Sequence, residues 1–347
     1  MRKTILLLLA LCIAESSFCC TSIIVGADAS ANSRVLLWKQ RDASSKYNYM
    51  DYFAAKEGCF SFVGLVGSAD TLRKEVWCGT NEKEFSLMNT VAYGLSPIID
   101  EDRPWEGIIM KRALEICVTV DDFEDYIKSL PQPNGLETNF GVSDANGNAA
   151  YFEVHDLGYV RFDVPRDGYL IRTNYAFTGR EGEGKGYDRY ELVERKMKAH
   201  KGKFDAEWIF SELAMQPIVA RDKSIASVVL DGNVLWCETG YSRGCYPIPV
   251  WVDAGNEIPT PLRKVDVQGS EANEIAYMLN VKYRGKSTAK KIDRIIRKKM
   301  KAEFEAYRDF AGVSDDFGID IDAVKRYNLA VTERFEDFKV SCTRFLQ

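Results

Sequence analysis

Cys20 stands at the position in this sequence with the most distinctive chemistry. It follows a basic start, an apolar run over 5–13 and a short polar segment, the pattern of a secretory signal peptide. The run is far shorter than the roughly 20 residues of a membrane-spanning helix, so we expect cleavage. A cut between Cys19 and Cys20 would leave small residues, Ser17 and Cys19, at the two positions that signal peptidase reads. The mature chain would then begin at Cys20.

An N-terminal cysteine carries a thiol and a free α-amine on one residue. The thiolate is a nucleophile, and the amine can accept the thiol proton near neutral pH, directly or through one water. No histidine is then required, and the sequence holds only two, His155 and His200. Two other interpretations of Cys20 stay open here, a lipid anchor and a disulfide partner.

The amino-acid composition argues against several other kinds of binding site. Basic and acidic side chains number 46 and 51, a net charge of −5, so there is no basic excess to hold nucleic acid. The stretch 286–301 is basic, but an apolar stripe runs through it, which favours a solvated helix face over a polyanion site. Two histidines exclude a three-histidine metal site. No segment after the signal is apolar for long enough to cross a membrane.

The remaining cysteines fit an exported protein. Seven of the nine cysteines lie at or after Cys20. In an oxidising compartment six of them could form disulfides. Cys237–Cys245 and Cys59–Cys78 are candidate pairs because their members lie near each other along the chain. An equally good interpretation is that most are small buried hydrophobes.

The elements that position these residues are mainly short strands. Ten β-type runs lie between Cys20 and about Val252, many joined by turns such as Asp231-Gly232-Asn233, which is typical of antiparallel hairpins. Helical periodicity interrupts them over 105–117, over 121–130 with Asp121 or Asp122 as the cap, and over 187–215 in two pieces. Strand runs interleaved with helix pairs predict packed antiparallel sheets with helical outer layers.

The chain changes character after 259–261. From Glu271 to Gln347 it is rich in charged residues with helical periodicity. We therefore expect three regions: a signal peptide over 1–19, a sheet-containing domain over 20–260, and a helical extension over 261–347 packed on the same domain.

Several motifs now resemble one enzyme family. The opening Cys-Thr-Ser-Ile-Ile-Val-Gly from Cys20, followed by Lys39-Gln40-Arg41-Asp42, is similar to the start of the linear amide C–N hydrolases. This family includes choloylglycine (bile salt) hydrolases, penicillin V acylases and isopenicillin-N acyltransferase-like proteins. The resemblance makes Asp42 the aspartate that orients the α-amine. Lys39 stands where bile salt hydrolases carry arginine, and we expect it to be a secondary or substrate-binding residue.

Three later segments resemble the same family in the same order. Gly-Thr-Asn-Glu-Lys-Glu-Phe around Asn81 is similar to its Gly-x-Asn-Glu-x-Gly-Leu/Phe motif, with Glu84 in place of glycine. The match makes Asn81 an oxyanion donor. Thr173-Asn174 resembles a strand end that supplies a second polar group, Asn174. The segment from Ala220 to Val229 resembles a late strand preceded by the family's arginine, which assigns Arg221 rather than Arg243.

The resemblance implies an α+β fold, the αββα four-layer sandwich of the N-terminal nucleophile hydrolases. It also implies an exported, periplasmic or secreted, cysteine amidohydrolase that cleaves a small-molecule amide through a thioester, without metal or organic cofactor, and it is compatible with a homo-oligomer. Relatives act on bile salts, penicillin V, N-acyl amino acids or acyl homoserine lactones, so the substrate stays open. The alternative is an exported binding protein or lipoprotein that keeps the fold without the chemistry.

Overall fold

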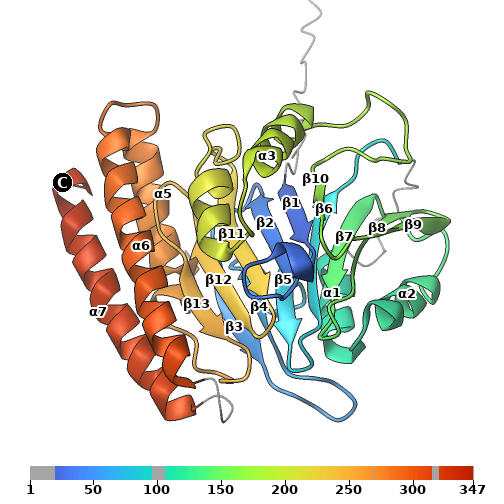
Figure 1. The fold of residues 1–347 in the computed structure, drawn as a ribbon, viewed down its shortest axis with the longest axis horizontal. Coiled ribbons are helices and arrows are strands. Elements are labelled where there is room, and N and C mark those ends of the chain that lie inside the picture. Colours follow the sequence, from blue (N-terminus) through green and yellow to red (C-terminus); the bar gives the residue numbers. More distant parts are fainter. Residues whose placement is uncertain (1–19, 96–105, 268, 315–319, 347) are drawn as a thin grey trace, which may run out of the picture.

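The computed structural model describes residues 20–95, 106–267, 269–314 and 320–346, and the expected signal peptide over 1–19 lies outside them. Two antiparallel sheets form the centre of the molecule (Figure 1). The first contains, in spatial order, β10 (Tyr169–Arg172), β1 (Thr21–Val25), β2 (Leu36–Asp42), β11 (Ser224–Asp231), β12 (Val234–Thr239) and β13 (Ile248–Trp251).

The second sheet has seven strands that follow the chain order. They are β3 (Asn48–Phe53), β4 (Phe62–Gly67), β5 (Cys78–Asn81), β6 (Ser86–Val91), β7 (Thr138–Ser143), β8 (Ala149–His155) and β9 (Gly158–Asp163). A separate two-stranded ribbon pairs β14 (Lys264–Asp266) with β15 (Gly269–Ser270). The two large sheets pack closely enough that a Cβ on Gly141 of β7 would lie 3.2 Å from Ile24 of β1.

Helices cover the outer faces of both sheets (Figure 1). Helices α1 (Glu106–Ile116) and α2 (Val120–Lys128) enclose an apolar core with the seven-stranded sheet. The six-stranded sheet packs against α3 (Tyr187–Ala199) and against α4 (Ala206–Trp208), which continues as a π-helical turn, Ile209–Ala214. The layers are therefore helix, sheet, sheet and helix, the predicted αββα sandwich.

The C-terminal helices lie beside β12 and β13 at one end of the sandwich (Figure 1). They are α5 (Glu271–Tyr283), α6 (Ala289–Ser314) and α7 (Ile321–Leu346). Phe304 of α6 packs on Trp236 of β12 with ring centroids 4.1 Å apart, and Trp251 of β13 lies 5.3 Å from Phe310. These aromatic contacts join the helices to the same core as the sheet.

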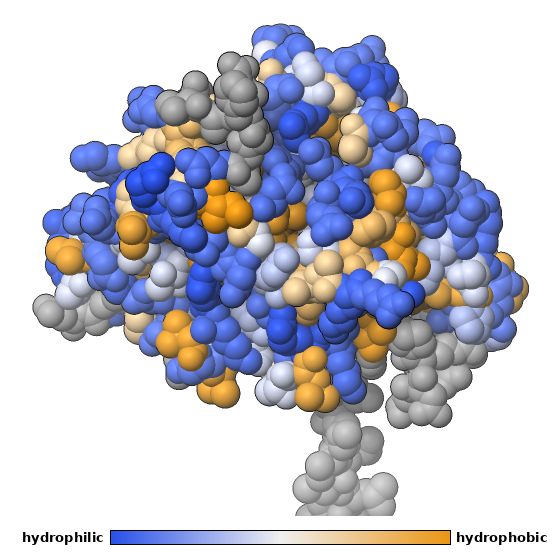
Figure 2. Space-filling model, turned by 90° about the horizontal axis from the view of Figure 1, so that it is seen from below, coloured by the Kyte–Doolittle hydropathy of each residue, from blue (hydrophilic) through white to orange (hydrophobic). Residues whose placement is uncertain are grey.

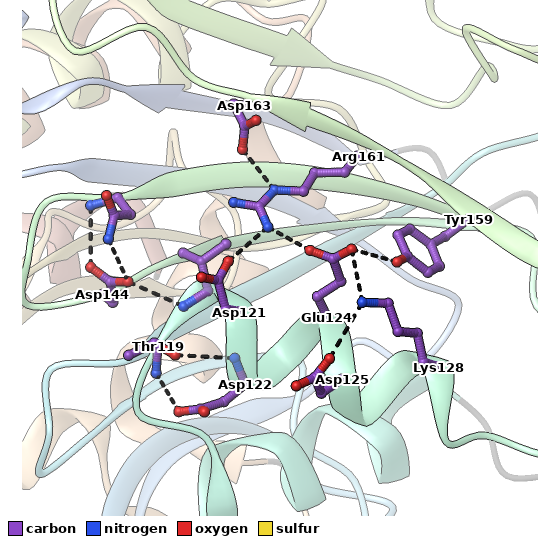
Figure 3. Close-up of polar contacts among 12 residues, drawn as sticks. Thr119, Asp121, Asp122, Glu124, Asp125, Lys128, Asp144, Tyr159, Arg161 and Asp163 are labelled. Atoms are coloured by element: carbon purple, nitrogen blue, oxygen red, sulfur yellow. Dashed lines mark hydrogen bonds and ion pairs between the residues drawn. The ribbon is translucent and has the colours of Figure 1, made fainter.

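A capping box begins α2, and Thr119 is the cap, not Asp121 or Asp122 as the sequence predicted (Figure 3). The Thr119 hydroxyl accepts from the Asp122 amide at 3.0 Å, and the Asp122 carboxylate accepts from the Thr119 amide at 2.8 Å. Asp122 is thus the third helical residue of the box. Arg161 of β9 then ties the helix to the sheet through Asp121 and Glu124.

The face of the molecule seen from below is largely hydrophilic, with apolar groups between the charged ones (Figure 2). Within the described ranges, no helix combines the length and the apolar character needed to cross a membrane.

Candidate active site

Cys20 lies immediately before β1, an interior strand of the six-stranded sheet between β10 and β2. Thr21 pairs with Gln40 and Ser22 with Lys39 across β1 and β2, so Cys20 lies beside the end of β2. Its thiol is 3.9 Å from the carbonyl oxygen of Asp42 and the residue is 6% exposed. Burial raises the pKa of the Cys20 thiol, and the positive charge of Lys39 is the largest influence that lowers it. The thiol therefore needs a base or a nearby cation to react at neutral pH.

Asp42, the last residue of β2, is held in a buried ion pair. Its carboxylate is 1% exposed, accepts from the Ser224 hydroxyl at 2.6 Å and pairs with the Arg221 guanidinium. Burial raises the pKa of Asp42 while Arg221 opposes the shift. The structure thus brings Asp42 and Arg221 together beside Cys20. Arg243 instead pairs with Asp293 of α6 at 3.2 Å.

Arg189 joins Asn174 to the residues around Cys20, and no sequence motif indicated this arginine. Arg189 of α3 is buried and donates to the Asn174 side-chain oxygen at 2.9 Å, to the Thr21 hydroxyl at 2.6 Å and to the Cys20 carbonyl. The Asn174 amide donates to the Val91 carbonyl at 3.0 Å. One guanidinium therefore fixes the start of β1 relative to Asn174.

The turn before α3 makes room for this arginine. Gly186 has φ +88°, and a Cβ there would lie 2.2 Å from the Arg189 guanidinium. Both the left-handed backbone and the close approach favour glycine. The sequence shows only one of two arginines in a helix rich in basic and acidic residues, which does not distinguish it from a surface charge.

Lys39 extends from β2 to the seven-stranded sheet. Its ammonium donates to the Trp77 carbonyl at 2.6 Å and to the Asn89 side-chain oxygen at 2.5 Å, and the side chain is buried. Burial lowers the pKa of Lys39, and Cys20 has the largest opposing effect. Two of the three ammonium hydrogens are thus used inside the protein. Asn89 is a second residue that the sequence analysis did not single out.

Asn81 makes four hydrogen bonds that hold local structure. Its amide donates to the carbonyls of Leu114 at 2.9 Å and Cys117 at 2.8 Å, and its oxygen accepts from the backbone of Lys83 and Phe85 at 3.0 and 3.1 Å. Both amide hydrogens are therefore occupied, and none is left for the oxyanion that the motif assigned to it.

Glu84, in the same turn, keeps the backbone conformation of the glycine it replaces. Its φ is +58°, in the left-handed region that glycine adopts most readily. Its side chain reaches the surface and pairs with Arg34 at 3.1 Å.

All seven cysteines from Cys20 onward are free thiols. The guesses Cys237–Cys245 and Cys59–Cys78 are therefore wrong. Cys78, Cys237 and Cys245 are fully buried, which agrees with the alternative interpretation of small apolar core residues. In the part of the chain that the structure describes, no group of three or more His, Cys, Asp or Glu side chains is placed to hold a metal ion.

Solved structures resemble this chain, although no sequence comparison finds a match. No family model matches the chain, and no curated protein matches it. A Caenorhabditis elegans ortholog of N-acylethanolamine-hydrolyzing acid amidase is 16% identical, with a TM-score of 0.46, over 60% of this chain and 91% of that one.

Two bacterial structures also resemble this chain, with low sequence identities and TM-scores below 0.5. A variant of conjugated bile acid hydrolase from Clostridium perfringens is 12% identical, with a TM-score of 0.46, over 68% of this chain and 93% of that one. Penicillin V acylase from Agrobacterium tumefaciens is 12% identical, with a TM-score of 0.41, over 67% and 85%.

Proposed function

We propose that this chain is an exported cysteine amidohydrolase that cleaves a linear amide bond of a small N-acyl substrate. The observation that carries the proposal is the position of Cys20, buried immediately before β1, in contact with Asp42 of the Asp42–Arg221 ion pair and within the electrostatic influence of the Lys39 ammonium. Cleavage before Cys20 would give this residue a free α-amine beside its thiol. A thiol with both a base and a cation beside it is an activated nucleophile.

The reaction would proceed in two steps. The Cys20 sulfur attacks the amide carbon, and its proton passes to the α-amine. The C–N bond then breaks, the leaving amine takes that proton, and a thioester is left on Cys20. Water adds to the thioester, and the acid and the free thiol are released.

Lys39 is the group best suited to stabilise negative charge in this reaction. Its ammonium is held by two acceptors from the opposite sheet, Trp77 and Asn89, and has one hydrogen left. A fixed cation in a buried site stabilises a developing oxyanion strongly, because no reorganisation is needed at the moment of reaction. Asn89 acts here as a positioning residue, Arg189 holds the start of the strand that carries the nucleophile, and Asp42 orients the α-amine.

The test combines N-terminal sequencing with the intact mass of the exported protein, before and after treatment with iodoacetamide. We expect a chain that starts at Cys20 and adds one label there rapidly, while the matched variant Cys78→Ser still labels at Cys20. A Cys20→Ser variant should label far more slowly and lose amide hydrolysis. A mass increased by a lipid, or a chain that starts elsewhere, would contradict the proposal and favour an anchored or non-catalytic protein.

A further inference from the structure

Arg41 is a second buried cation on the same face of β2 as Lys39. Side chains two residues apart on a strand point to the same side, and the pairing of Thr21 with Gln40 places Arg41 opposite Cys20. Arg41 is 5% exposed, and its guanidinium lies over the ring of Trp77, 4.7 Å from the centroid. The aromatic face fixes the plane of the guanidinium.

This guanidinium lacks an acceptor. Among the residues that the structure describes, none accepts a side-chain hydrogen bond from Arg41 or forms an ion pair with it, and its Nη1 is fully buried with no partner. Glu75 and Asp42 are the carboxylates that influence its pKa, and neither forms an ion pair with it. Burial lowers the pKa of Arg41 to about 10, and Cys20, Cys78 and Glu75 only partly oppose this.

Burying a guanidinium destabilises the folded protein unless an acceptor pairs with it. A buried, unpaired cation loses its hydration without compensation. The other cations described around Cys20 have protein acceptors: the buried Lys39 has Trp77 and Asn89, the buried Arg189 has Asn174, and the partly exposed Arg221 has Asp42. Arg41 differs from these because its partner is not supplied by the described protein residues.

We propose that Arg41 binds a carboxylate of the substrate, so that the enzyme acts on amides that carry an anionic group close to the scissile bond. A planar guanidinium matches a carboxylate with two parallel hydrogen bonds. Its position opposite Cys20 puts that carboxylate within a few bonds of the amide under attack. This inference rests on the proposed function and makes it more specific.

The carboxylate could belong to either half of the substrate, and two matched pairs of compounds distinguish the halves. N-octanoylglycine and N-octanoylglycinamide differ by a carboxylate on the amine side. The 4-nitroanilides of glutaric acid (monoanilide) and of pentanoic acid differ by a carboxylate on the acyl side. We would measure kcat/KM for all four with the mature wild type and with Arg41→Gln and Arg41→Lys.

We expect the wild type to prefer the charged member of one pair by about 10- to 100-fold, the usual effect of a charge-assisted hydrogen-bonded pair. Arg41→Gln should remove most of that preference, and Arg41→Lys should restore only part of it, since lysine cannot bind with two parallel bonds. Arg34→Gln, at an exposed arginine paired with Glu84, is the matched control and should keep the preference. Glu75→Gln should keep or increase it, because a competing negative charge is removed.

Three outcomes would overturn the inference about Arg41. They are equal rates within both pairs for the wild type, an equal loss on charged and neutral members in Arg41→Gln, or the same loss in Glu75→Gln as in Arg41→Gln, which would make Arg41 a structural partner of Glu75. Binding of the four compounds to Cys20→Ser by calorimetry separates the two proposals. Preferential binding of a carboxylate without any hydrolysis by the wild type would leave the Arg41 site standing and refute the amidohydrolase.

Discussion

The ammonium of Lys39 donates a hydrogen bond to the side-chain oxygen of Asn89 over 2.5 Å and thereby joins the two sheets beside Cys20. Lys39 comes from β2 and Asn89 from β6. The cation with the largest effect on the Cys20 thiol is therefore held from the opposite side of the sandwich, and its position depends on the packing of the two sheets.

Replacing Lys39 should change the pH dependence of Cys20. Burial raises the pKa of the thiol and Lys39 lowers it, so Lys39→Gln should raise that pKa further. The rate of iodoacetamide labelling should then reach its plateau at a higher pH than in the wild type. Lys83→Gln removes the same charge from the surface and should leave the profile in place. An unshifted profile in Lys39→Gln would show that the ammonium does not act on the thiol.

Asn89 should act through Lys39 and not on its own. Asn89→Leu removes the acceptor, and we expect kcat to fall by roughly tenfold or more, toward the 10²- to 10³-fold loss typical of a removed oxyanion donor. Asn89→Asp keeps an acceptor for the ammonium and should recover most of the activity. Equal loss in both variants would mean that Asn89 itself contacts the reacting atoms.

Replacing Asn81 should lower the free energy of unfolding more than it lowers kcat. Asn81→Ala removes four hydrogen bonds of a buried side chain, each worth about 1 kcal/mol. We expect a loss of about 2–4 kcal/mol in the free energy of unfolding, measured by urea denaturation, with kcat per folded molecule within a few-fold of wild type. A folded, stable and inactive variant would return the oxyanion role to Asn81.

The Asp42–Arg221 pair should be strongly coupled. Arg221→Met leaves the Asp42 carboxylate buried without its cation and should cost about 3 kcal/mol of stability. Adding Asp42→Asn should recover part of this, which a double-mutant cycle measures. Arg243→Met should cost less, because its partner Asp293 is partly exposed. Additive losses for Asp42 and Arg221 would contradict the coupling.

Glu238 of β12 should make stability fall as pH rises. It is fully buried, and burial raises its pKa well above the usual value, an effect that Ser242 only partly opposes. The folded state then keeps a proton that the unfolded chain releases above about pH 4.3. Glu238→Gln should therefore raise Tm at pH 8 and change it much less at pH 4. A pH-independent difference would indicate a packing effect instead.

The sequence predicted the layers of this fold because burial on a sheet or helix leaves a regular pattern of apolar residues. Ten of its strand runs correspond to strands, and Glu271 begins α5. It did not predict β3, β5, β13, β14 and β15 as strands. Tyr49, Asp51 and Phe53 alternate poorly with their neighbours, and β5 has only four residues, including Gly79.

The motifs predicted three residues that the structure places together, Cys20, Asp42 and Arg221, and their catalytic roles stay predictions. Asn81 shows the limit of that approach, because an amide in a turn can serve either a ligand or the backbone. Arg189 and Asn89 could not be found from the sequence, since their roles arise from contacts across the fold. A buried arginine on a helix has the same local signature as one that faces water.

The three contacts of Arg189 link catalytic competence to the docking of one helix. Because α3 supplies the guanidinium that holds Asn174 and the start of β1, Cys20 keeps its position only while α3 is packed on the sheet. If Cys20 is the nucleophile proposed above, detachment of this single helix would stop the reaction with both sheets still folded.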